Sequence, residues 1–171
     1  GAMRARHPHR RSHCLPRRWL MTDERMGDGL WRALGRLPRG SGVVFRHYSL
    51  AVDARQALLA RIERVAARRG LTVLVGGIEH GRHRGTLTAP VHSRREAVAA
   101  MRAGAAVLFV SPVFATRSHP GAKALGALRL GLLIRGLDLP VIALGGMNER
   151  RWRSLRPMGI AGWAAIDACL E

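Results

Sequence analysis

Residues suited to binding an anion gather in two short loops, and each loop directly follows an apolar run. The first loop follows VLFV, and its polar side chains are Ser111, Thr116, Ser118 and His119. The second follows PVIAL and holds Gly145–Gly146, whose backbone N–H groups can approach a ligand closely. Hydroxyls, an imidazole and bare amides can donate hydrogen bonds to an anion. We therefore expect any chemistry of this chain to lie here, although each segment alone also fits a strand followed by an ordinary turn.

The elements that must position these loops alternate between apolar runs and helical periods. Strands are expected within residues 18–22, 42–48, 71–77, 86–93, 106–110, 140–146 and 162–166. Helices are expected over 29–37, from Asp53 to Gly70, over 94–104, along the Ala- and Leu-rich segment with Lys123 and Arg129 to Gly136, and after Asn148. The expected caps are Asp28, Ser93 with Glu96, and Asn148, with Gly70 as a C-terminal stop. Continuous apolar strands between helices indicate an α/β fold whose parallel sheet is covered on both faces or closed as a barrel.

One segment breaks this alternation. IEHGRHRG, residues 78–85, is polar, contains glycines and has no helical period. It holds Glu79, His80 and His83, which are residue types that bind metals. We expect a solvated turn rather than a metal cluster, because arginines flank the histidines.

The composition fits a single domain with a basic extension. The chain has 171 residues, 47% of them hydrophobic, and one β/α domain is expected over 18–171. Residues 1–17 are expected to be a basic, disordered arm, in which Gly1 and Ala2 are typical of a cloning scar. The formal net charge is +18, but the arm lacks interleaved aromatic residues, which disfavours nucleic-acid binding as the main function. No apolar run reaches the roughly 18 residues of a membrane span, so a soluble cytoplasmic protein is expected.

Three segments resemble one protein family. SPVFATRSHPGAKALG, PVIALGGMN and GWAAIDA are similar to segments of the thiamine phosphate synthase family and its thiazole tautomerase relatives. The resemblance implies a (β/α)8 TIM-barrel-like fold and an activity that joins a pyrimidine diphosphate to a thiazole phosphate with release of diphosphate. It also implies a magnesium cofactor and phosphorylated small-molecule substrates. Pro112 stands where the tautomerase branch has a catalytic histidine, which favours the synthase branch.

The resemblance also implies roles for individual residues. It implies catalytic contacts for Arg46 and His119, with Arg46 at the place of a diphosphate-binding arginine on the second strand. It implies substrate or phosphate binding by Ser111, Thr116, Ser118, Gly145, Gly146 and Ile166. By residue type alone, Arg46 equally suits an ion pair with Asp23 or Glu24. His92 suits a structural hydrogen bond or proton transfer, and Trp152 and Trp163 are expected to pack in the core or at its rim.

The chain departs from the family pattern in ways that bear on activity. The family holds magnesium with an Asn-Asp pair after the third strand and an aspartate near the end of the fourth, whereas Gly76–Gly77 ends the third strand here. The third helix and fourth strand are expected to be missing, because only residues 78–85 precede the next strand. The last helix is expected to be truncated at Glu171, and Val44, Tyr48 and Asp167 replace a glutamine, a lysine and a serine.

Three functions stay open from the sequence. The first is a synthase-like transferase, and the absent carboxylates leave its activity undecided. The second is a catalytically inactive barrel that binds a thiamine-pathway phosphate ligand or a protein partner. The third is anion or nucleic-acid binding through the arginine arm. Unpaired strand edges beside the missing strand lead us to expect a homodimer.

Overall fold

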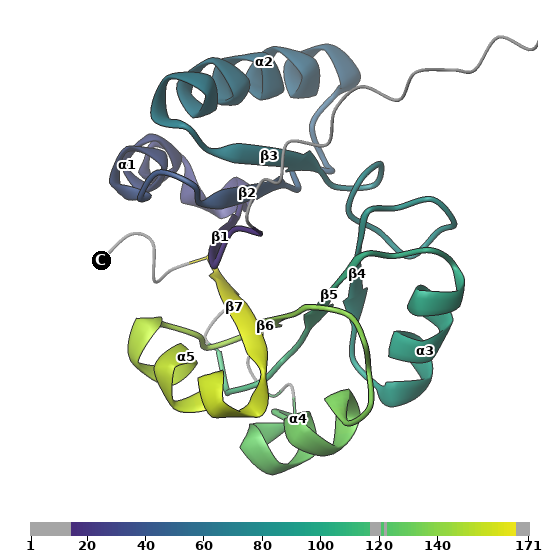
Figure 1. The fold of residues 1–171 in the computed structure, drawn as a ribbon. Coiled ribbons are helices and arrows are strands. Elements are labelled where there is room, and N and C mark those ends of the chain that lie inside the picture. Colours follow the sequence, from purple (N-terminus) through teal and green to yellow (C-terminus); the bar gives the residue numbers. More distant parts are fainter. Residues whose placement is uncertain (1–14, 117–120, 122, 167–171) are drawn as a thin grey trace, which may run out of the picture.

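Seven parallel strands form one sheet that curls around a central axis (Figure 1). The computed structural model describes residues 15–116, 121 and 123–166. The strands are β1 (Arg18–Met21), β2 (Gly42–Phe45), β3 (Thr72–Val75), β4 (Thr88–Val91), β5 (Val107–Val110), β6 (Val141–Leu144) and β7 (Ile160–Ala165). They pair in the order β3-β2-β1-β7-β6-β5-β4, and every pairing is parallel. The predicted α/β, TIM-barrel-like fold is confirmed.

The helices lie outside the curled sheet (Figure 1). They are α1 (Gly29–Arg36), α2 (Val52–Arg69), α3 (Arg94–Arg102), α4 (Gly126–Ile134) and α5 (Glu149–Leu155), with short 3-10 turns η1 (Glu24–Met26) and η2 (Arg156–Met158). No helix within the described residues has the length and apolarity needed to span a membrane.

Most predicted helix ends are confirmed. The Ser93 side chain accepts from the Glu96 amide, the Asn148 side chain caps α5, and Gly70 ends α2 with a left-handed φ of 65°. Two details were wrong. Asp28 precedes α1 but makes no capping hydrogen bond, because its own backbone is already helical (φ −67°, ψ −19°). Lys123 was expected on the helix that ends near Gly136, whereas α4 begins only at Gly126.

The core has an inner layer and two outer layers, because successive side chains of a strand point to opposite sides. Trp19, Val44 and Phe109 belong to the cluster inside the barrel. Outside, one apolar cluster packs β1 and β2 against α1 and α2, and another packs β4–β7 against α3, α4 and α5. Trp152 and Trp163 are buried in the latter cluster, which confirms their predicted place in the core.

The barrel closes through a single residue where a strand and a helix are missing. Between β3 and β4, His80 forms isolated parallel bridges with Gly76 on one side and Thr88 on the other. The His80 carbonyl accepts from the Gly77 amide at 2.8 Å, and the Thr88 amide donates to the Glu79 carbonyl at 2.9 Å. The predicted loss of the third helix and fourth strand is thus confirmed for this described segment.

The expectation of a solvated turn was wrong for His80, which is only 5% exposed. A sheet that lacks one strand has two edges whose backbone N–H and C=O groups need hydrogen-bond partners. A connecting residue buried between the two edges supplies some of these partners. The edges on which we based the expected homodimer are therefore paired in part within the chain.

Gly42 makes room for a buried indole, so we predict that Gly42→Ala destabilises the barrel. Gly42 lies opposite Trp19 in the β1–β2 register, and a Cβ at Gly42 would overlap the Trp19 ring. The ring is 2% exposed, donates from Nε1 to the Pro16 carbonyl at 2.7 Å and meets Phe109 edge-on at 5.3 Å, so it has little room to move. Overpacking of this kind costs about 1–3 kcal/mol of unfolding free energy, which urea denaturation measures.

Gly35→Ala is the matched control for this substitution. Gly35 lies in α1, and apart from its chain neighbours and the backbone of its own helix no atom lies within 4 Å of the place that a methyl group would take. Alanine there should raise stability by about 0.5–1 kcal/mol through helix propensity. Equal urea midpoints for the two variants would contradict the proposed overlap.

Candidate functional site

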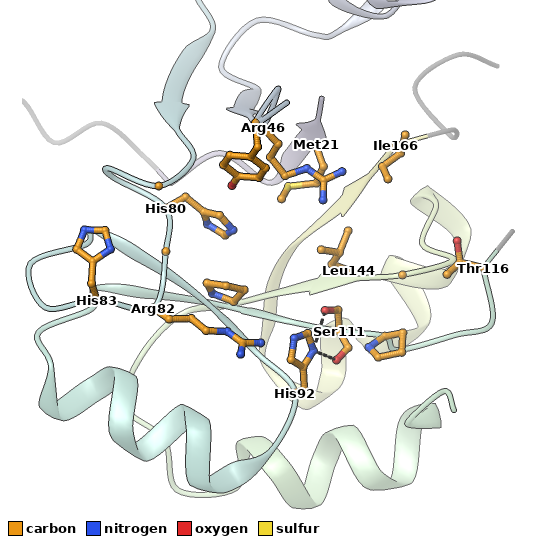
Figure 2. A pocket seen from close by; sticks show the side chains of 16 residues that line it. Met21, Arg46, His80, Arg82, His83, His92, Ser111, Thr116, Leu144 and Ile166 are labelled. Atoms are coloured by element: carbon orange, nitrogen blue, oxygen red, sulfur yellow. Dashed lines mark hydrogen bonds between the residues drawn. The ribbon is translucent and has the colours of Figure 1, made fainter. Parts of the chain in front are cut away.

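A cavity of about 610 Å³ lies at the carboxyl ends of the strands (Figure 2). Its lining comes from strand ends, from the loops after them and from the segment that closes the barrel. The lining residues are Met21, Arg46, Tyr48, Gly77, His80, Gly81, Arg82, His83, Pro90, His92, Ser111, Pro112, Thr116, Leu144, Gly145 and Ile166. This is the end of a parallel barrel at which functional loops gather.

Arg46 is a fixed cation on the wall next to β1 and β2. Its backbone amide donates to Thr22 Oγ1 and its Nε donates to the Thr22 carbonyl, both at 3.0 Å. Thr22 Oγ1 is itself 3.1 Å from His47 Nδ1, so the anchoring group is buried and held in turn. Burial lowers the pKa of Arg46, and the charge of Asp23 opposes that shift by favouring the guanidinium cation.

Arg46 also forms an ion pair with Asp23, one of the two partners considered from the sequence. Its Nη2 is 3.6 Å from Asp23 Oδ2. A side-chain hydrogen bond from Arg25 is the main reason that the pKa of Asp23 falls to about 2, so Asp23 is a carboxylate at neutral pH. Glu24, the other predicted partner, accepts instead from the Ser49 amide at 2.8 Å. Arg46 therefore forms the ion pair with Asp23 and lines the cavity at the same time.

His80 contributes a neutral ring to the cavity. Its Nδ1 lies 2.8 Å from Thr88 Oγ1, and its ring meets Phe109 edge-on with centroids 5.0 Å apart. Burial lowers the pKa of His80 to about 4, and the positive charge of Arg46 acts in the same direction. Near neutral pH, His80 is therefore a polar hydrogen-bonding group and not a cation.

A second polar group lies on the wall next to β4 and β5. His92 Nδ1 is 2.8 Å from the Ser111 carbonyl oxygen and 3.3 Å from Ser111 Oγ. Because a carbonyl oxygen only accepts, we assign the proton to Nδ1, and Nε2 is the acceptor of the neutral ring. The His92 amide donates to Glu96 Oε2 at 3.0 Å, and Arg82 Nη2 lies 3.7 Å from the same oxygen.

The loops after β5, β6 and β7 bring further predicted contacts to this cavity. Ser111, Thr116, Gly145 and Ile166 all line it, as does Arg46. Two predicted contacts, Ser118 and His119, and the replaced position Asp167 lie outside the described residues.

The two glycines of the pair Gly145–Gly146 have different surroundings. Gly145 lines the cavity, whereas Gly146 is not among the described lining residues. Gly145 has φ +94°, and a Cβ there would lie 2.9 Å from the Pro112 Cα. Gly146 has φ +58° and abuts the Ala115 carbonyl, while its own carbonyl accepts from Arg151 Nη1. Both positions thus require glycine for packing, whether or not they contact a phosphate.

Sequence reasoning missed three polar lining residues of the closing segment. His80, Arg82 and His83 come from residues 78–85, for which we had expected a solvated turn. A usable signal was present, since this basic segment directly follows an apolar run and must leave the sheet at the edge where the other loops gather. Tyr48 was noted only as a replacement for a lysine, yet it also lines the cavity.

The donor set of the described cavity does not fit magnesium. Magnesium is bound by carboxylate and phosphate oxygens, and none of the described lining residues is Asp or Glu. Asp23 and Glu24 line a separate recess of about 330 Å³ beside Arg46, where Arg25 and the Ser49 amide already engage them. Across the part of the chain that the structure describes, no three His, Cys, Asp or Glu side chains form a group that could hold a metal.

We predict that His80 makes folding stability depend on pH. Its folded pKa of about 4 lies below the ordinary value of 6.5, so the unfolded chain binds the proton more readily between these values. Stability from neutral His80 is fully present above the ordinary pKa and is lost as pH falls toward the folded pKa. Lowering the pH from about 7 to about 5 should cost roughly 2 kcal/mol through this residue, measured as a shift of the urea midpoint.

His80→Gln is the informative variant, because a glutamine can still hydrogen-bond Thr88 but does not titrate. Its urea midpoint should fall less than that of the unsubstituted protein over the same pH interval. An identical pH dependence in both proteins would show that His80 is not buried as a neutral ring.

Comparison with known proteins shows the family of this chain. The family model described as thiamine monophosphate synthase matches residues 77–169, more than half of the chain. A thiamine-phosphate synthase from Pyrococcus furiosus is 33% identical over 82 residues, which cover 48% of this chain and 40% of that protein. One from Desulfitobacterium hafniense is 37% identical over 82 residues, covering 47% of this chain and 40% of that protein. Each of these matches spans less than half of the relative's own length.

A solved structure extends the likeness to the first three strands. The structure of a thiamine phosphate pyrophosphorylase from Pyrococcus furiosus matches with a TM-score of 0.76 over 92% of this chain and 89% of that chain, at 18% identity. At 18% identity, this likeness shows a shared fold and nothing further. The barrel, the cavity at its carboxyl end and the family model agree, and the chain belongs to the thiamine monophosphate synthase family.

Proposed function

We propose that the cavity binds phosphorylated heterocycles of thiamine biosynthesis and that the chain joins a pyrimidine diphosphate to a thiazole phosphate. The main support is that Arg46, Ser111, Thr116 and Gly145, which come from three separate loops, surround one cavity. A guanidinium and hydroxyl groups suit diphosphate and phosphate esters. Met21, Leu144 and Ile166 add apolar surface that suits planar rings.

The proposed reaction is a substitution at carbon. The thiazole nitrogen attacks the methylene carbon of the pyrimidine diphosphate, a C–N bond forms and the C–O bond to diphosphate breaks. The bonding electrons leave with the diphosphate, and the proposal assigns stabilisation of that charge to the guanidinium of Arg46. Ser111 and Thr116 would hold the thiazole phosphate, together with Ser118 and His119 as predicted contacts. Since the described lining does not fit magnesium, we assign no step to a metal ion.

A second candidate function is binding of the same ligands without turnover. The described lining has no carboxylate, and that observation favours it. Such a barrel would keep the phosphate contacts while lacking the metal that the family resemblance implies for catalysis.

Turnover with an Arg46 variant tests the proposal. We predict that the purified chain forms thiamine phosphate from pyrimidine diphosphate and thiazole phosphate. Chromatography of the product and an assay of released diphosphate measure the rate. Arg46→Ala should lower the rate about a hundredfold, because it removes a fixed cation from the leaving group. Arg32→Ala, an exposed position on the outer helix α1, should leave the rate unchanged.

The outcomes separate the two candidates. A rate of product formation that falls about a hundredfold in Arg46→Ala and is unchanged in Arg32→Ala supports the transferase. Binding of either substrate by calorimetry without product supports the non-catalytic barrel. Failure of both substrates to bind would overturn both candidates.

A further inference from the structure

Two arginines face the cavity from different walls. Arg46 lies near the end of β2, whereas Arg82 comes from the segment that replaces the fourth strand, and its guanidinium points toward His92 and Ser111 (Figure 2). The ligand contacts proposed above use Arg46 and the later loops. Arg82, His80 and His92 have no part in them.

Arg82 projects from a segment that is fixed on both sides. The amide of the preceding residue, Gly81, donates to the Thr88 carbonyl at 3.0 Å, which ties the chain to β4. Thr86 Oγ1 donates to the Gly81 carbonyl at 3.1 Å and to the His83 carbonyl at 3.0 Å, which closes the turn around Arg82. The guanidinium is therefore presented from an ordered backbone.

The guanidinium remains able to bind an anion. Its 3.7 Å separation from Glu96 Oε2 is longer than a hydrogen bond, and the side chain is 62% exposed. Glu96 is the nearby carboxylate that would oppose an anion, and the same Oε2 already accepts from the His92 amide at 3.0 Å. A doubly charged phosphate group would compete well for a guanidinium held by so loose a pair.

The charge of the lining decides how an anion can be held here. The described lining has two arginines and three histidines, with neither Asp nor Glu. A divalent cation needs carboxylates to bring it to the site, whereas a phosphate can bind the arginines directly.

We propose that Arg82, together with His92 and Ser111, forms a second phosphate subsite, which shares Ser111 with the proposed thiazole phosphate contacts and binds a phosphate or diphosphate group directly, without a bridging divalent cation. Arg82 supplies the charge, Ser111 Oγ supplies a hydroxyl, and His92 Nε2 accepts from a protonated phosphate oxygen. That the phosphate belongs to a heterocyclic substrate rests on the proposed function. The affinity of this subsite for inorganic phosphate or diphosphate does not depend on the proposed function.

Calorimetric titration with inorganic diphosphate in EDTA at fixed ionic strength tests this subsite. We expect the full chain to bind diphosphate without magnesium, and Arg82→Ala to weaken binding about tenfold or more. Arg84→Ala is the matched control, because Arg84 is an exposed arginine of the same segment that does not line the cavity, and its effect should stay within about twofold. Arg82→Lys should restore part of the loss, since lysine keeps the charge but not the planar fork.

Three results would overturn the subsite. Equal losses in Arg82→Ala and Arg84→Ala would mean general attraction to a basic surface. Binding that requires added magnesium would mean a metal-bridged anion. An unchanged affinity in Arg82→Ala, with a melting temperature equal to that of the parent protein, would remove Arg82 from the site.

These results are distinguishable from a failure of the proposed function. If Arg46→Ala abolishes turnover while Arg82→Ala changes nothing, the transferase stands and the subsite falls. If diphosphate binds through Arg82 but neither heterocyclic substrate binds, the subsite stands and the proposed function falls.

Discussion

The backbone of His80 pairs with both edges of the sheet, and the barrel and its cavity depend on this contact. A parallel sheet with a missing strand has two free edges, whose amide and carbonyl groups need partners. His80 bridges Gly76 and Thr88 in the place of a strand, and its side chain is buried against Phe109. The imidazole can occupy this position because burial holds it neutral, with its Nδ1 satisfied by Thr88 Oγ1.

This closure also sets the charge of the cavity. A helix and strand in this place would carry the chain away from the axis and back, whereas the short connection lays residues 77–83 against the opening. Arg82 and His83 thereby join Arg46, which Thr22 holds on the neighbouring wall. The described lining therefore has two arginines and no carboxylate, and the proposed anionic ligand would meet these guanidinium groups.

The cavity draws on two parts of the chain with different relationships to known proteins. The family model matches residues 77–169, which include Thr116 and Gly145. Met21, Arg46 and Tyr48 lie before that segment, where the likeness is one of fold. The parts meet at the β1–β7 pairing and again at His80, so the site forms only when both are folded together.

The sequence by itself determined the features that depend on near neighbours. The apolar runs predicted the seven strands, and Ser93, Asn148 and Gly70 predicted helix ends, because a cap acts within one turn of its own residue. The same reasoning predicted a common edge for the loops at Ser111 and Gly145, since parallel strands all end on one side.

Only the tertiary structure decided which residues of different elements meet. No local pattern shows that His80 is buried between strands, that Thr22 anchors Arg46, or that Arg82 turns toward Ser111. Asp28 failed as a cap because the preceding turn had already placed its backbone in a helical conformation. These outcomes depend on the curvature and closure of the whole sheet, which join residues far apart in the chain and leave no periodic trace in the sequence.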